Sequence, residues 1–364
     1  MKEPSYGTIL IWTKKLGLYQ LEKEKEKADD WVIILDESVE FGHDKLLVIY
    51  GIPSSKINFK RALNYNDLTP LTIASGSKWT GDLIEQQIKK VENEYGKILY
   101  AVADGGNAIR KSLRKAEITH VYDLTHKLAW FLKELYKEDP EFISYTKQMA
   151  KMRGALSLSE VSHVLPPNQR VHSRFMNLDV ISEWGMKILN YLNSGNKEDR
   201  IFKELKWVEN FEALIQELTE VNKILAEIKA LLKTQGLSVK NKKKAKKILE
   251  KLQIQNSRTN RLKVFISDYL DEIVNSLPKR KNIVCTSDII ESSFGKYKNY
   301  ISNNPMVGIT NLSLTMAAFT SKLESDKVNA ALENVKTIDI KQWSQNNIGD
   351  TNLQRRKRVL KKVG

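Results

Sequence analysis

The sequence has very little cysteine, since Cys285 is the only one among its 364 residues. A single cysteine excludes a disulfide framework and a zinc site built from cysteines, and it favours a reducing compartment. Long apolar runs are also missing. No stretch approaches the roughly 18 apolar residues that a membrane helix needs, and the first residues lack the apolar segment of a signal peptide. These absences predict a cytoplasmic protein with no membrane partner.

Acidic residues are outnumbered by basic ones. The chain has 59 Lys+Arg and 44 Asp+Glu, which gives a formal net charge of +15. Such an excess favours a polyanionic partner, and nucleic acid is the leading candidate. A hydrophobic content of 41%, with 7 Trp and 13 Tyr, excludes a disordered chain. The length predicts two or three domains.

Short apolar, β-branched runs and amphipathic segments alternate between residues 30 and 122. The pattern predicts three strands separated by turns, followed by strands that alternate with helices. Such an order favours a mixed sheet with helices on its faces. The expected strands are 31–35, 46–50, 70–74, 97–103 and 119–122, and the expected helices are 80–95 and one that ends near residue 115.

Strand signals disappear between residues 124 and 282, where the pattern is helical. Apolar residues from Phe211 to Leu232 follow steps of three and four, which is typical of a coiled-coil seam. Gly236 ends that helix, and a run with six lysines follows at 240–247. With a second long helix ending at Leu277, we expect a helical hairpin with a lysine-rich tip. The tip is either a solubilising surface or a contact for DNA phosphates.

The two ends of the chain carry further helical signals. Ser5 can cap a helix within residues 1–20, and two more helices are expected from about Asp288 and near 312–332. The chain ends in a basic cluster, RRKRVLKK at 355–362. This cluster is either a frayed terminus or an arm that binds phosphates.

Three acidic residues stand out by their positions. Asp36 follows the first expected strand, Asp104 follows the fourth, and Glu291 lies in the first turn of a later helix. Three clustered carboxylates suit the two-metal hydrolysis or transfer of phosphodiesters, because Mg²⁺ and Mn²⁺ prefer carboxylate oxygens. Each residue also has a purely structural explanation. Asp104 can belong to an ordinary Asp-Gly-Gly turn, and Glu291 can form a capping box with Asp288.

The sequence segments around these acids resemble those of a known family. WVIILDESVE, YAVADGGNAIRKSLRK and TSDIIESSFGKYK look like the three signature blocks of DDE transposases from bacterial insertion sequences. The resemblance implies an α/β fold, an RNase H-like mixed sheet interrupted by a large all-α insertion. It implies two Mg²⁺ (or Mn²⁺) ions, with Asp36 holding both and Asp104 and Glu291 holding one each.

The resemblance also implies roles for other residues. Asp123-Leu124-Thr125-His126 resembles the Asp-x-x-His element of several transposase superfamilies, although a helix cap and a packed histidine would give the same residues. Lys296 and Lys298 would contact DNA at the element end, and solvated lysines are the alternative. One of the tryptophans of the helical segment could stack on a flipped base, although core packing explains each of them: Trp130, Trp184 and Trp207. In the basic tail, the candidates for DNA contact are Arg355, Arg356, Lys357 and Arg358.

The function implied by the resemblance is that of an insertion-sequence transposase. Such an enzyme hydrolyses DNA at the element ends and joins the ends to target DNA, as a homo-oligomer on double-stranded DNA in the prokaryotic nucleoid. Residues 1–20 resemble a remnant of a helix-turn-helix, which suggests a truncated frame or a DNA-binding part encoded separately. The expected division of the chain is 1–20, 28–126 for the first part of the core, 127–284 for the insertion, 285–334 for the second part of the core, and 335–364 for the tail.

Three other functions remain compatible with the sequence. An RNase H-like nuclease would keep the fold without strand transfer. A non-catalytic DNA-binding relative would explain the short N-terminal segment. A sugar or acetate kinase shares the order of strands, but the basic charge and the lack of a second matching core oppose it.

Overall fold

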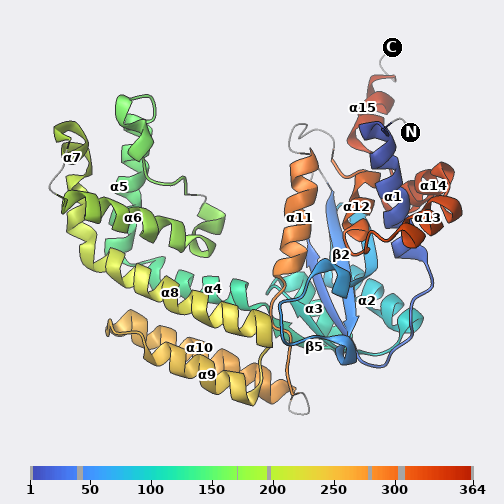
Figure 1. Ribbon diagram of the computed structural model, residues 1–364, viewed down its shortest axis with the longest axis horizontal. Helices are drawn as coiled ribbons and strands as arrows, with labels where there is room; N and C mark the ends of the chain where they lie inside the picture. The colour runs from blue at the N-terminus through green and yellow to red at the C-terminus, as the bar shows by residue number, and fades with distance from the viewer. Residues whose placement is uncertain are drawn as a thin grey trace. The chain divides into compact units, whose positions relative to one another are not determined.

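The computed structural model describes residues 3–38, 44–169, 171–194, 198–277, 281–301 and 308–361. The chain forms two compact units (Figure 1). The core unit contains Met1–Asp123 and Val284–Gly364, and the helical unit contains Leu124–Ile283. Within the described ranges, no helix combines the length and apolar character needed to cross a membrane.

The core unit is built on one five-stranded sheet with the order β3-β2-β1-β4-β5. Strand β2 runs antiparallel to β1 and β3, whereas β4 runs parallel to β1 and β5. This is the topology of an RNase H-like fold, so the predicted fold class is confirmed. The strands are β1 (Trp31–Glu37), β2 (Lys45–Pro53), β3 (Thr69–Gly76), β4 (Ile98–Ala103) and β5 (Thr119–Tyr122).

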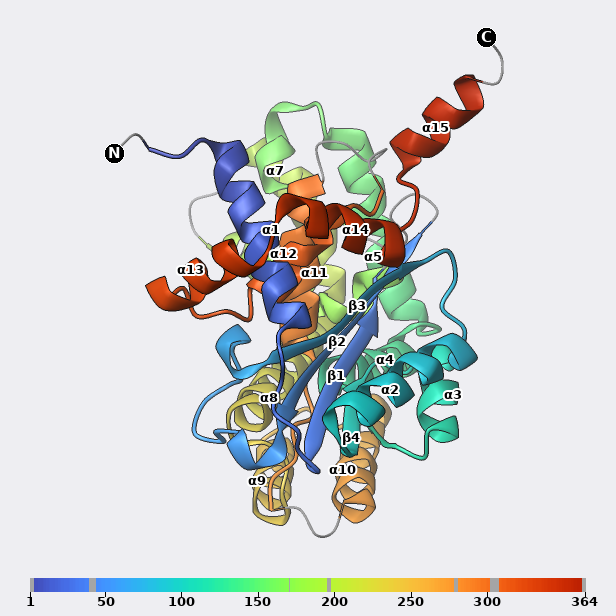
Figure 2. The same ribbon diagram turned by 90° about the vertical axis from the view of Figure 1, so that its right-hand side faces the viewer.

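Helices α2 (Gly81–Tyr95) and α3 (Asn107–Lys115) cover one face of the sheet (Figure 2). Alternate residues of β1, namely Trp31, Ile33 and Leu35, are buried in the apolar core on this face. Helix α2 begins where the sequence predicted, because the Thr80 hydroxyl accepts a hydrogen bond from the backbone of Leu83. It ends at Gly96, whose φ of 110° favours glycine.

The opposite face of the sheet carries α11 (Asp288–Ile301) and α12 (Leu314–Ala318). The buried hydroxyl of Tyr50, on β2, lies 2.7 Å from the Ser293 hydroxyl of α11 and donates to the carbonyl of Met316 at 3.1 Å. The Tyr100 hydroxyl of β4 accepts a hydrogen bond from the backbone of Val284 at 3.0 Å. Two tyrosines of the sheet therefore attach the second part of the core to the first.

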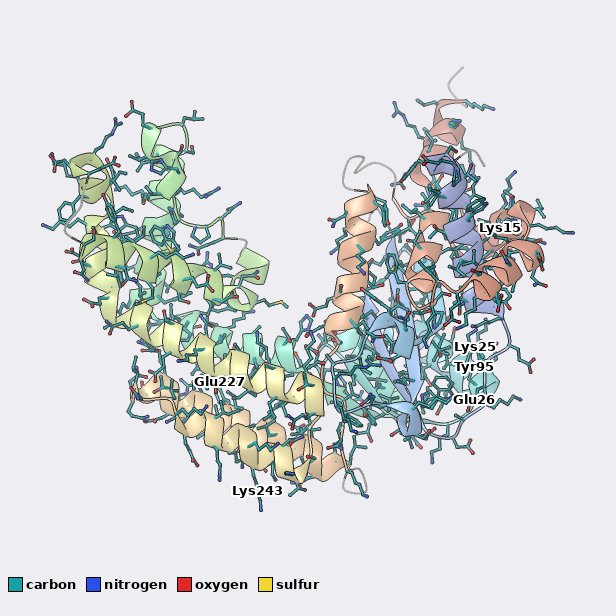
Figure 3. The ribbon with its side chains drawn as sticks, in the orientation of Figure 1. Lys15, Lys25, Glu26, Tyr95, Glu227 and Lys243 are labelled. Atoms are coloured by element: carbon teal, nitrogen blue, oxygen red, sulfur yellow. The ribbon has the colours of Figure 1, made fainter. Side chains whose placement is uncertain are left out.

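Helix α1 (Tyr6–Glu22) is capped by Ser5, as predicted, and packs against α12. A Cβ on Gly17 would lie 2.0 Å from the carbonyl oxygen of Leu314, so only glycine allows this close approach. Lys15 also donates to the carbonyl of Leu332 at 3.2 Å (Figure 3). The structure thus places the first helix inside the core unit.

The C-terminal part of the core unit contains more helices than the sequence indicated. The single helix expected near 312–332 is two helices, because α12 ends and α13 (Ser325–Asn334) begins after a short irregular segment. The segment expected as a tail forms α14 (Thr337–Asn347) and α15 (Asn352–Leu360). Thr351 and Gln354 form a capping box that starts α15.

The helical unit contains α4 to α10, as the absence of strand signals predicted. Every apolar residue of the predicted seam in and before α8 is buried: Phe211, Leu214, Leu218, Val221, Leu225, Ile228 and Leu232. The helices are α4 (Leu124–Tyr136), α5 (Pro140–Leu156), α6 (Leu178–Leu192), α7 (Asp199–Leu205), α8 (Glu212–Gln235), α9 (Val239–Glu250) and α10 (Ser257–Ser276). The 3₁₀ turns of the two units are η1 (Ser54–Lys56), η2 (Tyr65–Asp67), η3 (Glu160–Val164), η4 (Val171–Met176), η5 (Lys206–Phe211) and η6 (Asn311–Ser313).

The second long helix of the expected hairpin is divided into α9 and α10. Asn256 caps α10 by accepting from the backbone of Thr259, whose hydroxyl accepts from the backbone of Asn256. Residues expected inside the second long helix are therefore the start of a separate helix. The lysine run lies in α9 and not at the tip of a hairpin.

Candidate active site

Three aspartates lie in a row at the carboxyl ends of the parallel strands. The register pairs Ile34 with Val102, so two residues further along Asp36 is level with Asp104. Ala103 pairs with Tyr122, so one residue further along Asp104 is level with Asp123. Neighbouring strands are about 4.8 Å apart, so the three residues occupy adjacent positions along one edge of the sheet.

The aspartate of β1 belongs to the sheet face that α11 covers. Ile34 pairs with Tyr50, and the Tyr50 hydroxyl contacts Ser293 on α11. Asp36 is two residues beyond Ile34 and so lies on the same face of the strand. Helix α11 also packs against β1. The helix that carries Glu291 and the strand that carries Asp36 are thus neighbours.

Glu291 lies close to the third aspartate of the row. One carboxylate oxygen of Asp123 and one of Glu291 are within 4.8 Å of each other. At the start of the helix, the backbone of Ser287 donates to Asp123 Oδ2 at 2.6 Å. Helix α11 begins at Asp288, so the cap position belongs to Ser287 and not to Asp288 as in the capping box that the sequence allowed.

His126 is three residues after Asp123, in the first turn of α4. One of its ring nitrogens lies within 4.8 Å of an Asp123 oxygen, as one helical turn of separation allows. The Asp-x-x-His pair singled out in the sequence therefore places a carboxylate and an imidazole side by side. In the described residues, Asp36 and Asp104 do not join a group of three ligand atoms within that distance.

The turn after β4 is shaped by close packing. A Cβ on Gly105 would lie 2.2 Å from the hydroxyl oxygen of Tyr122, so a larger residue would displace that ring. The next residue, Gly106, donates its backbone N–H to Asp104 Oδ1 at 2.9 Å. The Asp-Gly-Gly sequence thus forms an ordinary Asx turn, and the same turn fixes the direction of the Asp104 carboxylate.

Neighbouring groups experience a negative potential at this edge of the sheet. Burial, together with the carboxylates of Asp104 and Asp123, raises the pKa of the Tyr122 phenol. Burial, together with Asp123 and Asp288, also raises the pKa of the Cys285 thiol. The acidic groups therefore create a negative potential that disfavours further negative charge on their neighbours, and a bound cation would offset it.

The two lysines predicted to contact DNA lie on α11. The Lys296 ammonium is 4.2 Å from the centre of the Tyr65 ring and 5.0 Å from that of Phe319, so it forms cation–π contacts within the core unit. Lys296 is exposed, and Lys298 is half-buried two residues further along.

The arginines of the predicted basic arm lie on α15. Arg355 forms an ion pair with Asp44 at 3.0 Å, and Arg358 forms one with Asp350. Arg356 and Lys357 are exposed, with no ion pair in the described part of the chain. Two of the four predicted DNA-contact residues of the arm are thus paired with carboxylates of the core unit.

The tryptophans of the helical unit differ in exposure. The Trp184 indole donates to the carbonyl of Val164 at 3.1 Å, and Trp207 packs against Tyr145 and Phe211. Trp130 is 43% exposed. Core packing therefore accounts for the first two.

The donor set fits a hard divalent cation. Carboxylate oxygens are the ligands that Mg²⁺ and Mn²⁺ prefer. Two oxygens on one Mg²⁺ are at most about 4.2 Å apart, since each bond is about 2.1 Å. One oxygen of Asp123 and one of Glu291 lie within 4.8 Å of each other, which is comparable with that separation. Asp36 and Asp104 offer further carboxylates along the same edge.

Sequence reasoning gave Asp123 only an auxiliary role, whereas the structure places one of its carboxylate oxygens within 4.8 Å of one of Glu291. The sequence contained a signal for this role, because Asp123 directly follows the strand β5 in the same way that Asp104 follows β4. Applying the strand-end rule to every strand would have found it.

No protein-family model and no curated protein matches the chain. Among solved structures, the chain is similar to one described as "Drosophila P element transposase strand transfer complex". The TM-score is 0.42 and the identity 9%, over 89% of this chain and 86% of that chain.

Proposed function

We propose that this protein is a metal-dependent DNA transposase that cleaves DNA at the ends of a mobile element and joins those ends to target DNA. The observation that carries the proposal is the row of Asp36, Asp104 and Asp123 at the carboxyl ends of three parallel strands, with Glu291 beside it. An RNase H-like sheet and a net charge of +15 support it.

The acidic residues would hold two Mg²⁺ or Mn²⁺ ions, with Asp36 shared between them and Asp104 and Glu291 on either side. Bound there, the ions would activate the attacking oxygen and stabilise the leaving oxygen of a phosphodiester. Asp123 lies within reach of the Glu291 carboxylate and orients the start of α11 through the Ser287 backbone. His126 would position a nearby water or DNA group through its ring nitrogen.

Tyr50 and Gly105 support this arrangement without touching the substrate. Tyr50 joins the sheet to α11 beside Glu291, and Gly105 allows the tight turn that aims Asp104. Because cleavage and joining are both displacements at phosphorus, one set of carboxylates can serve both steps. Basic residues outside the acidic edge would hold the DNA, whose phosphates the acids alone would repel.

The test uses a plasmid that carries the genomic DNA flanking the gene on both sides, incubated with Mg²⁺ or Mn²⁺. We expect nicking and end joining by the natural protein, and a loss of at least about 100-fold in Asp36→Asn, Asp104→Asn and Glu291→Gln, since even outer ligand-sphere changes cost 10- to 100-fold. Asp82→Asn is the matched control, because Asp82 is an exposed core-unit carboxylate that pairs with Lys111 and Lys115.

Each outcome has a distinct meaning. Unchanged nicking in Asp36→Asn would contradict the proposed site. Nicking without joining would favour an RNase H-like nuclease, and metal-independent DNA binding without nicking would favour a non-catalytic relative. Manganese binding measured by electron paramagnetic resonance should weaken in Asp104→Asn and Asp123→Asn and stay unchanged in Asp82→Asn.

A further inference from the structure

Helix α9 has three faces with different surroundings. Asn241, Ala245 and Leu249 are buried, and the Asn241 side chain donates to the carbonyls of Gln235 and Gly236 at the end of α8. This inward face fixes the helix against the rest of the helical unit. The remaining faces carry the lysines of the run at 240–247.

Two lysines on one flank of the helix share a single aspartate. Asp271 of α10 accepts Lys242 through Oδ1 at 2.6 Å and Lys246 through Oδ2 at 2.8 Å. These hydrogen bonds lower the pKa of Asp271. Lys244 donates to Gln235 Oε1 at 3.0 Å. Three of the six lysines therefore have partners inside the helical unit.

The other three lysines form what we call the outward stripe: Lys240, Lys243 and Lys247. Their spacing of three and four residues places them on one side of the helix, opposite the buried face. All three are exposed, and none has an ion pair or a hydrogen bond through its ammonium in the described part of the chain. Figure 3 shows Lys243 extending away from the neighbouring helices.

The outward stripe carries a cost for the helix. Lysines three and four residues apart repel one another, and Lys240 lies near the positive end of the helix dipole. The first turn of α9 contains no acidic residue that would offset this repulsion. A helix optimised only for stability would distribute these charges differently, so the stripe indicates a partner outside the chain.

We propose that the outward stripe binds the phosphate backbone of duplex DNA. The stripe spans about 10 Å along the helix, which corresponds to about three base pairs. Ammonium groups on flexible stems suit phosphates as point charges and read no base sequence. The inference rests on the proposed function for the identity of the polyanion, and it adds a holding surface on the helical unit to the acidic edge of the core unit.

The test compares two double variants of the full chain that remove the same charge from the same helix. Lys243→Gln/Lys247→Gln removes two outward lysines, and Lys242→Gln/Lys246→Gln removes the two that pair with Asp271. Affinity for a 30-base-pair duplex of unrelated sequence is measured across salt concentrations without added metal. We expect the outward variant to lose about two units of the slope of log affinity against log salt, and tens of fold in affinity at 0.1 M salt.

The flank variant should keep the salt slope of the natural protein. Thermal unfolding by circular dichroism should show that the outward variant is at least as stable as the natural protein. Equal slopes in all three proteins, or an equal loss in both variants, would overturn the inference. If the natural protein nicks DNA but the outward lysines have no effect on affinity, the proposed function is supported and the inference about the stripe is contradicted. Stripe-dependent DNA binding without any nicking would support the stripe and contradict the transposase proposal.

Discussion

Acidic residues are used in opposite ways in the two units. In the core unit, Asp36, Asp104 and Asp123 lie beside one another at the strand ends, with Glu291 near the last of them. In the helical unit, the buried Glu217 of α8 lies against an arginine. Gathering like charges costs stability unless a cation is present, whereas pairing a buried acid with a base removes that cost. The comparison is in line with the metal site that we propose in the first unit and indicates a structural centre in the second.

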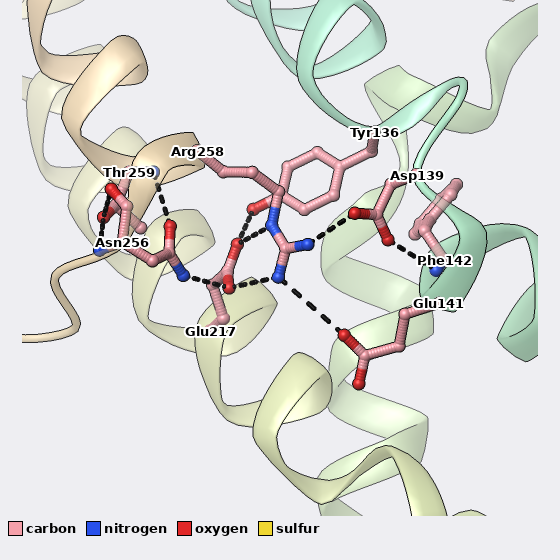
Figure 4. A network of polar contacts seen from close by, with 8 residues as sticks. All are labelled: Tyr136, Asp139, Glu141, Phe142, Glu217, Asn256, Arg258 and Thr259. Atoms are coloured by element: carbon pink, nitrogen blue, oxygen red, sulfur yellow. Dashed lines mark hydrogen bonds and ion pairs between the residues drawn. The ribbon is translucent and has the colours of Figure 1, made fainter.

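The structural centre is a hydrogen-bonded network (Figure 4). The Arg258 guanidinium donates to both oxygens of Glu217, at 2.8 and 2.7 Å, and to Asp139 at 2.5 Å. Tyr136 and Asn256 also donate to Glu217, each at 2.6 Å. Because Glu217 is only 2% exposed, this network connects α4, α5, α8 and α10 through groups that must remain paired.

The largest effect is expected from breaking that network. Arg258→Met leaves Glu217 buried without its cation and should lower the free energy of unfolding by about 3–5 kcal/mol. Urea unfolding measures the loss, and hydrogen exchange should locate it in residues 124–283. Arg200→Met is the control, since Arg200 pairs with Glu160 on the surface and its loss should cost less than about 1 kcal/mol. Equal effects of both substitutions would remove the distinction between a buried and a surface pair.

A smaller effect is expected from packing. Gly17→Ala places a methyl group against the Leu314 carbonyl and should lower the stability of the core unit by about 1–3 kcal/mol. Gly154→Ala, on α5 of the helical unit, meets no atom within 4 Å and should raise stability by about 0.5–1 kcal/mol. Thermal unfolding of both variants gives the comparison. A Gly17→Ala protein as stable as the natural one would show that α1 is not held close to α12.

The smallest effect is expected from pH. Burial would raise the pKa of Glu217, but hydrogen bonds from Arg258 and Tyr136 outweigh burial and hold that pKa below its usual value of 4.5. A depressed pKa gives stability that is complete above the unfolded pKa and is lost as the pH falls through the folded pKa. Below about pH 4.5, the helical unit should lose up to about 1.4 kcal/mol per pH unit through this group. Unfolding of Glu217→Gln between pH 3 and 6 should lack this component, and an unchanged slope would contradict it.

Local elements were predictable where one period dominated the sequence. β1 and β2 are short continuous apolar runs, and α8 has apolar residues at regular steps of three and four. All three elements are present in the structure. Boundaries were missed where polar residues served as caps. The sequence pattern predicted one long helix where Asn256 caps the start of a separate helix, α10. At the start of α11, the cap position belongs to Ser287 and not to Asp288.

The site was predictable only as a set of separate acids. The sequence indicated Asp36 and Asp104 because each follows a strand, and Glu291 because it lies at a helix start. It could not show that Asp123 lies close to Glu291, since their proximity depends on how α11 meets the end of β5.

The sequence by itself determined the order of the elements, the basic charge and the acids at the strand ends, because periodicity and strand-end position are local properties of a chain. Only the tertiary structure decided which acids are neighbours and which lysines of α9 have partners. The reason is physical. The strand register aligns residues far apart in the sequence along one edge, and Asp271 pairs with two lysines on one flank of α9 while the lysines of the outward stripe remain exposed.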